Sequence, residues 1–187
     1  MPSMNDSNPS LAPIVIFSHG KETGPWGAKI RRLADVAQGA GWQVLSADYA
    51  ALTKQTDAPA QDRLAALLAL KLPIHSCLVL VGSSMGGWVS AAAAMQLQPA
   101  GVFLLAPALG IESYPSQWPE LPLKAELAII HGWADDVIPA SHSQTYAELS
   151  CAVRTTRLHL LPDDHRLGAS LDEIAGLFVL FLKRCAA

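Results

Sequence analysis

The residues with the clearest chemical potential lie in the stretch Gly82-Ser83-Ser84-Met85-Gly86. The apolar run Leu78–Val81 precedes it, and the alanine-rich segment Val89–Met95 follows it. Strand, sharp turn and helix form the context in which Gly-x-Ser-x-Gly exposes a serine hydroxyl above a sheet. The small residues at 82 and 86 let the strand and the helix approach closely. The stretch predicts a serine nucleophile at Ser84, with an ordinary strand–helix turn as the alternative.

A serine hydroxyl is a weak nucleophile at neutral pH unless a base accepts its proton. Histidine suits this role because it changes its protonation state near neutral pH. His165 follows the apolar run 157–161 and is the preferred base. Asp163 and Asp164 could orient His165 or only shape its turn. An ordinary surface position is the alternative for His165 itself.

A carboxylate would hold the imidazole in one tautomer and stabilise the imidazolium ion. Asp135 and Asp136 are the candidates, because both follow the apolar run 127–131. Either could instead form a turn or cap a helix near Pro139. The residues alone leave the choice between them open.

The other histidines are assigned no chemical role. His19 and His131 each precede a glycine at the end of a predicted strand, where we expect structural roles in turns. The remaining three lie in a connection, a helix and a strand: His75, His142 and His159. No metal site is expected, because the His and Asp residues lack compact ligand spacing.

Apolar runs alternate with helical patterns along the chain. The predicted strands are 14–17, 42–46, a run from about 77 to Ser84, 101–106, 127–131 and 157–161. The predicted helices are 28–38, 61–71, the segment after Ser84 to about 97, 140–149 and 171–184. Residues 50–59 and 110–122 are predicted to be loops.

This alternation predicts an α/β fold with a mostly parallel six-stranded sheet and helices on both faces. In such a sheet, ligands bind beyond the carboxyl ends of the strands. Ser84, the two candidate acids and His165 all follow such ends, so they are expected to meet there. Residues 13–187 are predicted to form one domain, with a flexible N-terminus over 1–12.

Composition excludes several classes of protein. The net charge of −3 offers no footprint for nucleic acid or an anionic membrane. Three cysteines argue against a disulfide framework. Residues 1–13 lack the pattern of a signal peptide, and no apolar run is long enough to span a membrane. A cytoplasmic protein acting on a small molecule is expected, with a monomer as the default oligomeric state.

Four motifs in register resemble the α/β-hydrolase superfamily, and most closely its small, lidless bacterial esterases and thioesterases. They are Ser18-His19-Gly20, Gly82–Gly86, His131-Gly132-x-x-Asp135-x-x-Ile138-Pro139 and Asp164-His165-x-Leu167. The order Ser, Asp, His is that of the family's triad. The resemblance implies Ser84 as nucleophile, Asp135 rather than Asp136 as acid, His165 as base, and no cofactor.

An oxyanion hole is expected from two backbone N–H groups. One belongs to Met85, the residue after the nucleophile, and the other to Lys21 in the loop after the first strand. The pocket candidates lie in loops at or near the strand ends: Trp118, Trp133, Ile138 and Leu167. Trp118 is the candidate lid, and Trp88 is expected in the core.

The chain departs from fuller members of the family in two ways. The two initial antiparallel strands have no counterpart in residues 1–12, and only 110–122 could serve as a cap. An open cleft for short or exposed acyl groups is therefore expected. A serine hydrolase of carboxylic esters or thioesters is predicted. The alternatives are a lyase or acyltransferase on the same fold, or a non-catalytic interaction protein.

Overall fold

The computed structural model describes residues 11–53 and 60–187. In these residues six strands form one sheet, in the order β2-β1-β3-β4-β5-β6. Every pair of neighbouring strands is parallel. The strands are β1 (Ile14–Ser18), β2 (Gln43–Ala47), β3 (Leu78–Ser83), β4 (Gly101–Leu105), β5 (Glu126–Gly132) and β6 (Thr156–Leu161). The predicted six-stranded α/β fold is confirmed.

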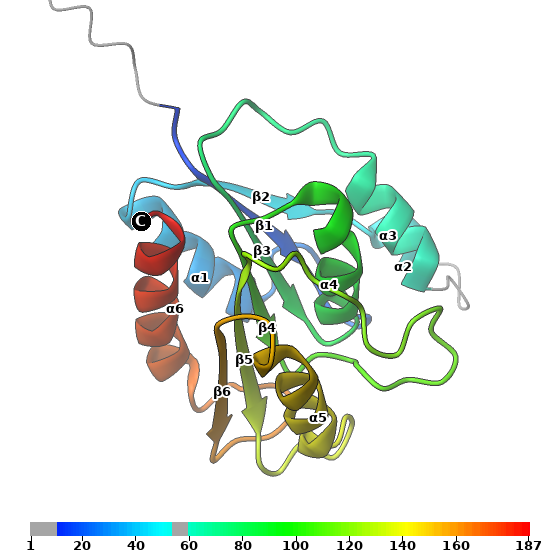
Figure 1. The fold of residues 1–187 in the computed structure, drawn as a ribbon. Coiled ribbons are helices and arrows are strands. Elements are labelled where there is room, and N and C mark those ends of the chain that lie inside the picture. Colours follow the sequence, from blue (N-terminus) through cyan, green and yellow to red (C-terminus); the bar gives the residue numbers. More distant parts are fainter. Residues whose placement is uncertain (1–10, 54–59) are drawn as a thin grey trace, which may run out of the picture.

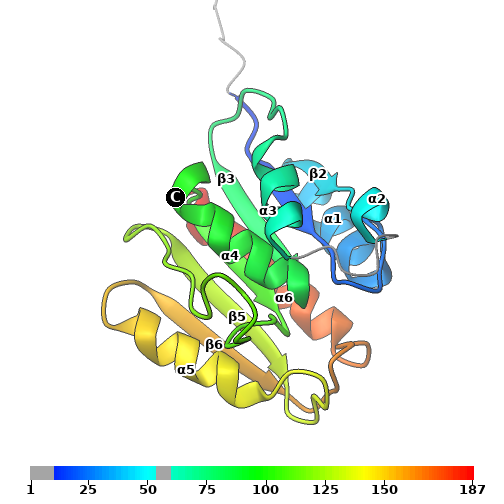
Figure 2. The same cartoon turned by 90° about the vertical axis from the view of Figure 1, so that its right-hand side faces the viewer.

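Helices cover both faces of this sheet, as Figures 1 and 2 show. The helices are α1 (Ala28–Gly39), α2 (Ala50–Thr53), α3 (Ala60–Leu68), α4 (Met85–Leu97), α5 (Ala140–Cys151) and α6 (Leu171–Cys185). Leu33 of α1 and Phe178 of α6 belong to the apolar core on one face. Leu67 of α3, Trp88 of α4 and Tyr146 of α5 belong to the core on the other. The central strands are buried on both sides, as their uninterrupted apolar runs predicted.

The prediction of a loop over 50–59 is wrong in its first part, where Ala50–Thr53 forms α2. The Ala50 N–H donates to Asp48 Oδ1 at 2.8 Å, so the aspartate side chain satisfies the first N–H of this short helix. Residues 54–59 lie outside the described residues.

The connection between β4 and β5 contains no helix or strand, as predicted for 110–122. It is tied to α4, because Trp88 Nε1 donates to the Ser116 carbonyl oxygen at 2.6 Å. Trp88 itself is buried, as predicted. The segment in the position of a cap is thus a short loop packed on the helix.

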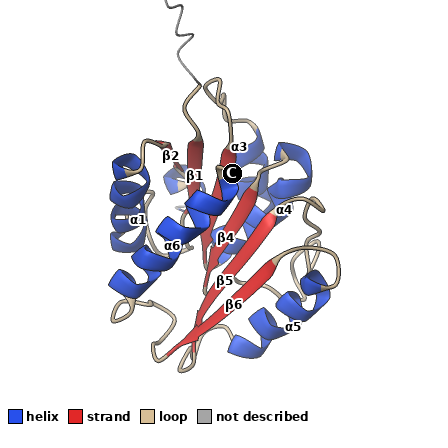
Figure 3. Cartoon of the chain, turned by 60° about the vertical axis from the view of Figure 1, so that its left-hand side comes forward, coloured by secondary structure: helices blue, strands red, loops and turns tan. Residues whose placement is uncertain are grey.

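The strand order reverses at β1, where the chain moves first to β2 on one side and later to β3 on the other. In Figure 3, β2 and β1 are labelled side by side at one side of the sheet, and β4, β5 and β6 follow across it. Connections diverge from the carboxyl ends at such a point and leave a crevice for ligands. The loop that begins with His19 leaves β1 there, and Ser84 follows β3.

Candidate active site

Ser84 occupies the sharp turn between β3 and α4. Its φ of 54° and ψ of −122° lie in a region that residues with a side chain rarely adopt. The turn is anchored on both sides: the Ser84 N–H donates to the Leu105 carbonyl, and the N–H groups of Gly87 and Ala108 donate to the Ser84 carbonyl. A Cβ at Gly82 would overlap the backbone of Gly86, so only glycine lets the helix start so close to the strand.

The three predicted polar residues meet at the carboxyl ends of the strands. The Ser84 hydroxyl Oγ lies 3.0 Å from His165 Nε2. His165 Nδ1 lies 2.8 Å from Asp135 Oδ2. When the proton of the neutral imidazole lies on Nδ1, the Nδ1–H group donates a hydrogen bond to the carboxylate. Nε2 then carries no proton and can accept the proton of the serine hydroxyl. The Asp135 side chain is fully buried, and that of His165 is 18% exposed.

The neighbouring acids have other positions. Asp136 is exposed, and it is Asp135 that bonds to His165. Asp163 accepts from the N–H groups of Asp164 and Ser170, each at 2.8 Å. Asp164 accepts from the Arg166 N–H at 2.7 Å. Asp163 and Asp164 therefore shape the turn that carries His165.

The Asp135 carboxylate is held at both oxygens. Its Oδ1 accepts from the N–H groups of Val137 at 2.9 Å and Ile138 at 2.8 Å. Burial by itself would raise the pKa of Asp135. The hydrogen bonds from Ile138, His165 and Val137 outweigh it and hold the pKa below its ordinary value. The carboxylate is ionised at neutral pH.

A second histidine, which the sequence placed only in a structural turn, contacts the same carboxylate. His131 Nε2 lies 2.9 Å from Asp135 Oδ2, the oxygen that also bonds to His165. Burial lowers the pKa of His131, although its bond to Ile138 and the charge of Asp135 oppose the shift. The signal in the sequence is the spacing of four residues between His131 and Asp135 across a strand end.

The loop after β1 lies against the nucleophile, since a Cβ at Gly20 would be 3.4 Å from Ser84 Cβ. Among the described residues, neither the Lys21 nor the Met85 backbone N–H donates to a protein acceptor. Their role as oxyanion donors stays a prediction. His19 holds the loop, with Nδ1 at 2.7 Å from the Gly20 carbonyl and Nε2 accepting from the Tyr49 N–H at 3.3 Å.

Sequence reasoning missed Arg63, a buried arginine of α3. Its guanidinium donates to the carbonyl oxygens of His19 and Gly20 at 3.2 Å and of Lys21 at 3.4 Å. Three successive carbonyls of the loop are therefore fixed by one side chain. The signal is its place on the apolar face of α3, whose other buried residues are Ala60 and Leu67.

No protein-family model matches this sequence, and no curated protein matches it significantly. Solved structures do match. A protein from Xanthomonas campestris pv. campestris, assigned as a hydrolase of the alpha/beta superfamily, is 28% identical with a TM-score of 0.77. The match covers 91% of this chain and 98% of that one. This chain has the fold of the α/β-hydrolase superfamily.

Two more distant structures have the same α/β-hydrolase fold. Est1E from Butyrivibrio proteoclasticus is 20% identical with a TM-score of 0.76, over 96% of this chain and 91% of its own. Dienelactone hydrolase from Anabaena variabilis is 20% identical with a TM-score of 0.74, over 94% and 87%. The predicted resemblance is confirmed at the level of the superfamily.

Lys29 of α1 also lies beside this site. Its Nζ lies 3.5 Å from the His165 carbonyl oxygen. Burial lowers the pKa of Lys29 to about 8, against the opposing charges of Asp135, Asp164 and Asp163. The Lys29 ammonium group therefore lies against the loop that carries His165, and it loses its proton more easily than an exposed lysine does.

The residues predicted to line the substrate pocket differ in how much of each side chain is exposed. Trp133 is 62% exposed on the loop that carries Asp135. Ile138 and Leu167 are buried in the interior and offer little surface to a ligand. Trp118 stacks on Tyr146, with ring centroids 6.4 Å apart. It lines a cavity of about 370 Å³ against α5, and the walls of this cavity include none of Ser84, Asp135 and His165.

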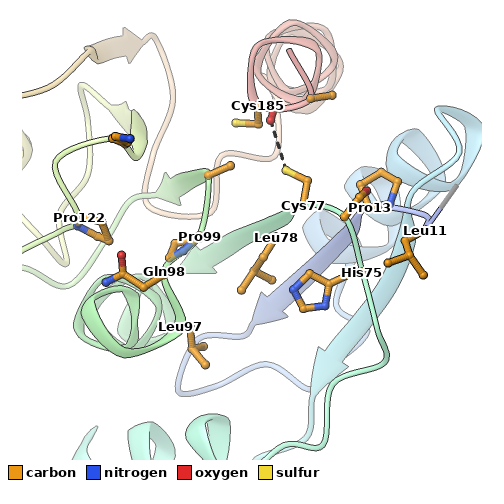
Figure 4. A pocket seen from close by; sticks show the side chains of 14 residues that line it. Leu11, Pro13, His75, Cys77, Leu78, Leu97, Gln98, Pro99, Pro122 and Cys185 are labelled. Carbon is orange, nitrogen blue, oxygen red and sulfur yellow. Dashed lines mark hydrogen bonds between the residues drawn. The ribbon is translucent and has the colours of Figure 1, made fainter.

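A second cavity, of about 840 Å³, lies at the opposite end of the sheet (Figure 4). Its walls include Pro13, Cys77 and Ala100, which immediately precede β1, β3 and β4. Cys77 Sγ donates to the Cys185 carbonyl oxygen at 3.3 Å across this cavity. The carboxyl ends of the strands, where Ser84 lies, are therefore remote from it.

Residues 11–53 and 60–187 contain no group of three or more His, Cys, Asp or Glu side chains arranged to hold a metal ion. Within the same residues, no helix is both long enough and apolar enough to cross a membrane.

Proposed function

We propose that this chain is a serine hydrolase of carboxylic esters or thioesters, with Ser84 as nucleophile, His165 as base and Asp135 as acid. The observation that carries the proposal is the continuous path of hydrogen bonds from Ser84 Oγ through His165 to Asp135, at 3.0 and 2.8 Å. Each bond has the length that proton transfer and imidazole orientation require. Esterases among the structural neighbours add support at the level of the fold.

In the proposed reaction, Ser84 Oγ attacks the acyl carbon while its proton moves to His165 Nε2. The imidazolium ion is stabilised by ionised Asp135 at Nδ1. Collapse of the tetrahedral intermediate expels the alcohol or thiol, which takes the proton from His165. Water, activated by the same histidine, then attacks the acyl-enzyme and releases the carboxylic acid. No cofactor is needed for these steps.

The negative charge on the tetrahedral oxygen needs donors that are fixed before the reaction. The backbone N–H groups of Lys21 and Met85 are proposed to supply them. Loss of one such donor costs about 3 kcal/mol of transition-state stabilisation in comparable enzymes. The buried guanidinium of Arg63 fits this proposal, since it holds the carbonyls on the Lys21 side of the loop.

The loop between β4 and β5 packs on α4 and α5 through Trp88 and Tyr146, and it forms no helical cap. The substrates proposed are therefore short or exposed acyl groups rather than long chains that need an enclosed tunnel. Trp133 is proposed as the aromatic surface beside the site, because its side chain is 62% exposed.

Fluorophosphonate labelling of the purified protein tests the nucleophile directly. Parent, Ser84→Ala and His165→Ala proteins are compared, with a chain-length series of nitrophenyl esters and acyl thioesters run in parallel. We expect labelling and turnover in the parent and loss of both in the two variants. Asp135→Asn and Asp136→Asn form a matched pair, of which only the first is expected to lose activity.

Three outcomes are informative. Turnover that falls with acyl length supports an open site for short chains. Labelling of Ser84 without turnover of any ester or thioester contradicts the hydrolase and favours a lyase or acyltransferase. A folded parent with neither labelling nor turnover contradicts an activated serine altogether.

A further inference from the structure

We propose that His131 is a positioning residue of the candidate active site: it fixes the Asp135 carboxylate at the oxygen that orients His165. The inference deepens the proposed function and rests on it for its kinetic consequences. It starts from one geometric fact. Asp135 Oδ2 lies 2.9 Å from His131 Nε2 and 2.8 Å from His165 Nδ1, so two imidazoles converge on one oxygen.

The partners of His131 define its tautomer. Nε2 faces two atoms that can only accept, Asp135 Oδ2 and the Ile138 carbonyl oxygen at 3.0 Å. The proton must therefore lie on Nε2. Nδ1 lies 2.6 Å from Ser143 Oγ, a hydroxyl that can donate to it. Every polar atom of the ring is matched to a partner of the right kind.

Burial keeps His131 in a single protonation state. His131 and Ser143 are both fully buried. Desolvation lowers the pKa of His131 below its ordinary value, so its imidazole is neutral at neutral pH. His131 is thus a fixed neutral donor, whereas His165, with its side chain 18% exposed, can accept the proton of Ser84.

The hydrogen bonds of Asp135 explain what this donor does. Val137 and Ile138 hold Oδ1 through their backbone N–H groups. His131 and His165 share Oδ2. Without His131, one side of Oδ2 would lose its donor and the carboxylate could tilt away from the plane that suits His165. The second histidine therefore preserves the direction in which His165 points its Nε2 at Ser84.

A purely structural histidine would not need to face Asp135. Ser143 and Ile138 alone give each ring nitrogen one partner. The bond to Oδ2 is additional, and it is the link that connects α5, which carries Ser143, to the candidate triad.

The test compares variants of His131 that differ only in the donor. His131→Gln places an amide N–H₂ near the position of Nε2, whereas His131→Leu fills the space without a donor. We expect kcat to fall about tenfold or more in the leucine variant, the value of one hydrogen bond to a charged group. KM should change little, and the glutamine variant should recover most of kcat.

Imidazole NMR gives a readout that does not depend on turnover. In the parent, His131 is expected as a single Nε2–H tautomer, and the His165 Nδ1 proton is expected at low field because it bonds to a carboxylate. That low-field signal should move or vanish in His131→Leu and persist in His131→Gln. His159→Gln is the control, since it removes a histidine of the neighbouring strand β6.

If His131→Leu does not fold, His131→Asn replaces it. Its shorter amide reaches the Nδ1 position and not Asp135, so the same loss is expected. Equal kcat in the leucine, or asparagine, and glutamine variants overturns the inference, and so does an unchanged low-field signal without the donor. Absence of turnover and of Ser84 labelling in the parent overturns the proposed function instead, while the NMR comparison still decides the role of His131.

Discussion

Gly86 stands so close to Ser18 that a Cβ atom added to the glycine would overlap the Ser18 carbonyl oxygen. The first turn of α4 therefore rests directly on the end of β1. This contact brings the loop of the candidate oxyanion hole beside Ser84, which immediately precedes the same helix. The geometry of the site therefore depends on glycine at position 86 as well as on the polar side chains.

Substitution of Gly86 should strongly destabilise the folded protein. Gly86→Ala must displace backbone rather than a flexible side chain, and we expect the free energy of unfolding to fall by about 3 kcal/mol. Gly176→Ala is the matched control, because Gly176 lies exposed in α6 and its Cβ would meet nothing within 4 Å. That variant should gain about 0.5–1 kcal/mol from helix propensity. Urea unfolding measures both, and a Gly86→Ala protein as stable as the parent would contradict the packing.

Backbone strain at Ser84 predicts that a residue able to adopt a positive φ without strain would stabilise the folded protein. Ser84→Ala and Ser84→Gly both lose the hydroxyl and its bond to His165, so both should be inactive. Only glycine relieves the φ of 54°. We expect the glycine variant to be more stable than the alanine variant by about 1 kcal/mol, measured by thermal and urea unfolding. An alanine variant of equal or higher stability would mean that the turn is not strained.

The guanidinium of Arg63 should matter for both stability and rate. Arg63→Met leaves the carbonyls of His19, Gly20 and Lys21 without this charged donor. A loss of about 3 kcal/mol in the free energy of unfolding is expected, with a lower kcat because the Lys21 N–H is no longer fixed. Arg32→Met removes an arginine whose partner Asp172 is 92% exposed, and it should leave both quantities nearly unchanged. Similar effects in the two variants would refute the role of Arg63.

Stability should fall as the pH is lowered below the ordinary histidine pKa of 6.5. Burial lowers the pKa of His131 and of His19, so the unfolded chain binds protons in this range that the folded chain does not. Each histidine then contributes up to about 1.4 kcal/mol per pH unit, down to its folded pKa. Unfolding measured from pH 7 to pH 5 should show this slope, and His131→Gln should reduce it. An identical slope in the variant would show that His131 is already able to charge in the folded state.

Much of the fold could be predicted because neighbouring residues encode it. The apolar run at 78–81, the glycines around Ser84 and the helical segment after it specify strand, turn and helix within one stretch. The alternation of such units predicts a parallel sheet, since parallel strands need crossover connections. Ser84, His165 and the two candidate acids, Asp135 and Asp136, could be named for the same reason: each follows a strand whose carboxyl end lies at one edge. The resemblance to the α/β-hydrolase superfamily then favoured Asp135.

Other features could not be predicted, because the hydrophobic pattern of the sequence does not show which way an individual side chain points. Predicted pocket walls such as Leu167 are buried in the core, although they lie in loops. The short helix α2, whose first N–H donates to the Asp48 side chain, was not indicated by composition. In the sequence, Arg63 is indistinguishable from an ordinary surface arginine of a helix. Its role follows only from the packing of α3 against the loop after β1.

The sequence by itself determined the order of the strands and of the longer helices, and it placed Ser84, His165 and the pair Asp135 and Asp136 at strand ends, because periodicity and turn residues act over a few neighbours. Only the tertiary structure decided that Asp135 rather than Asp136 bonds to His165, and that His131 shares its carboxylate. Those bonds join residues brought together by the sheet, such as Ser84 and His165, which are 81 positions apart. Their geometry depends on the packing of the strands and helices between them.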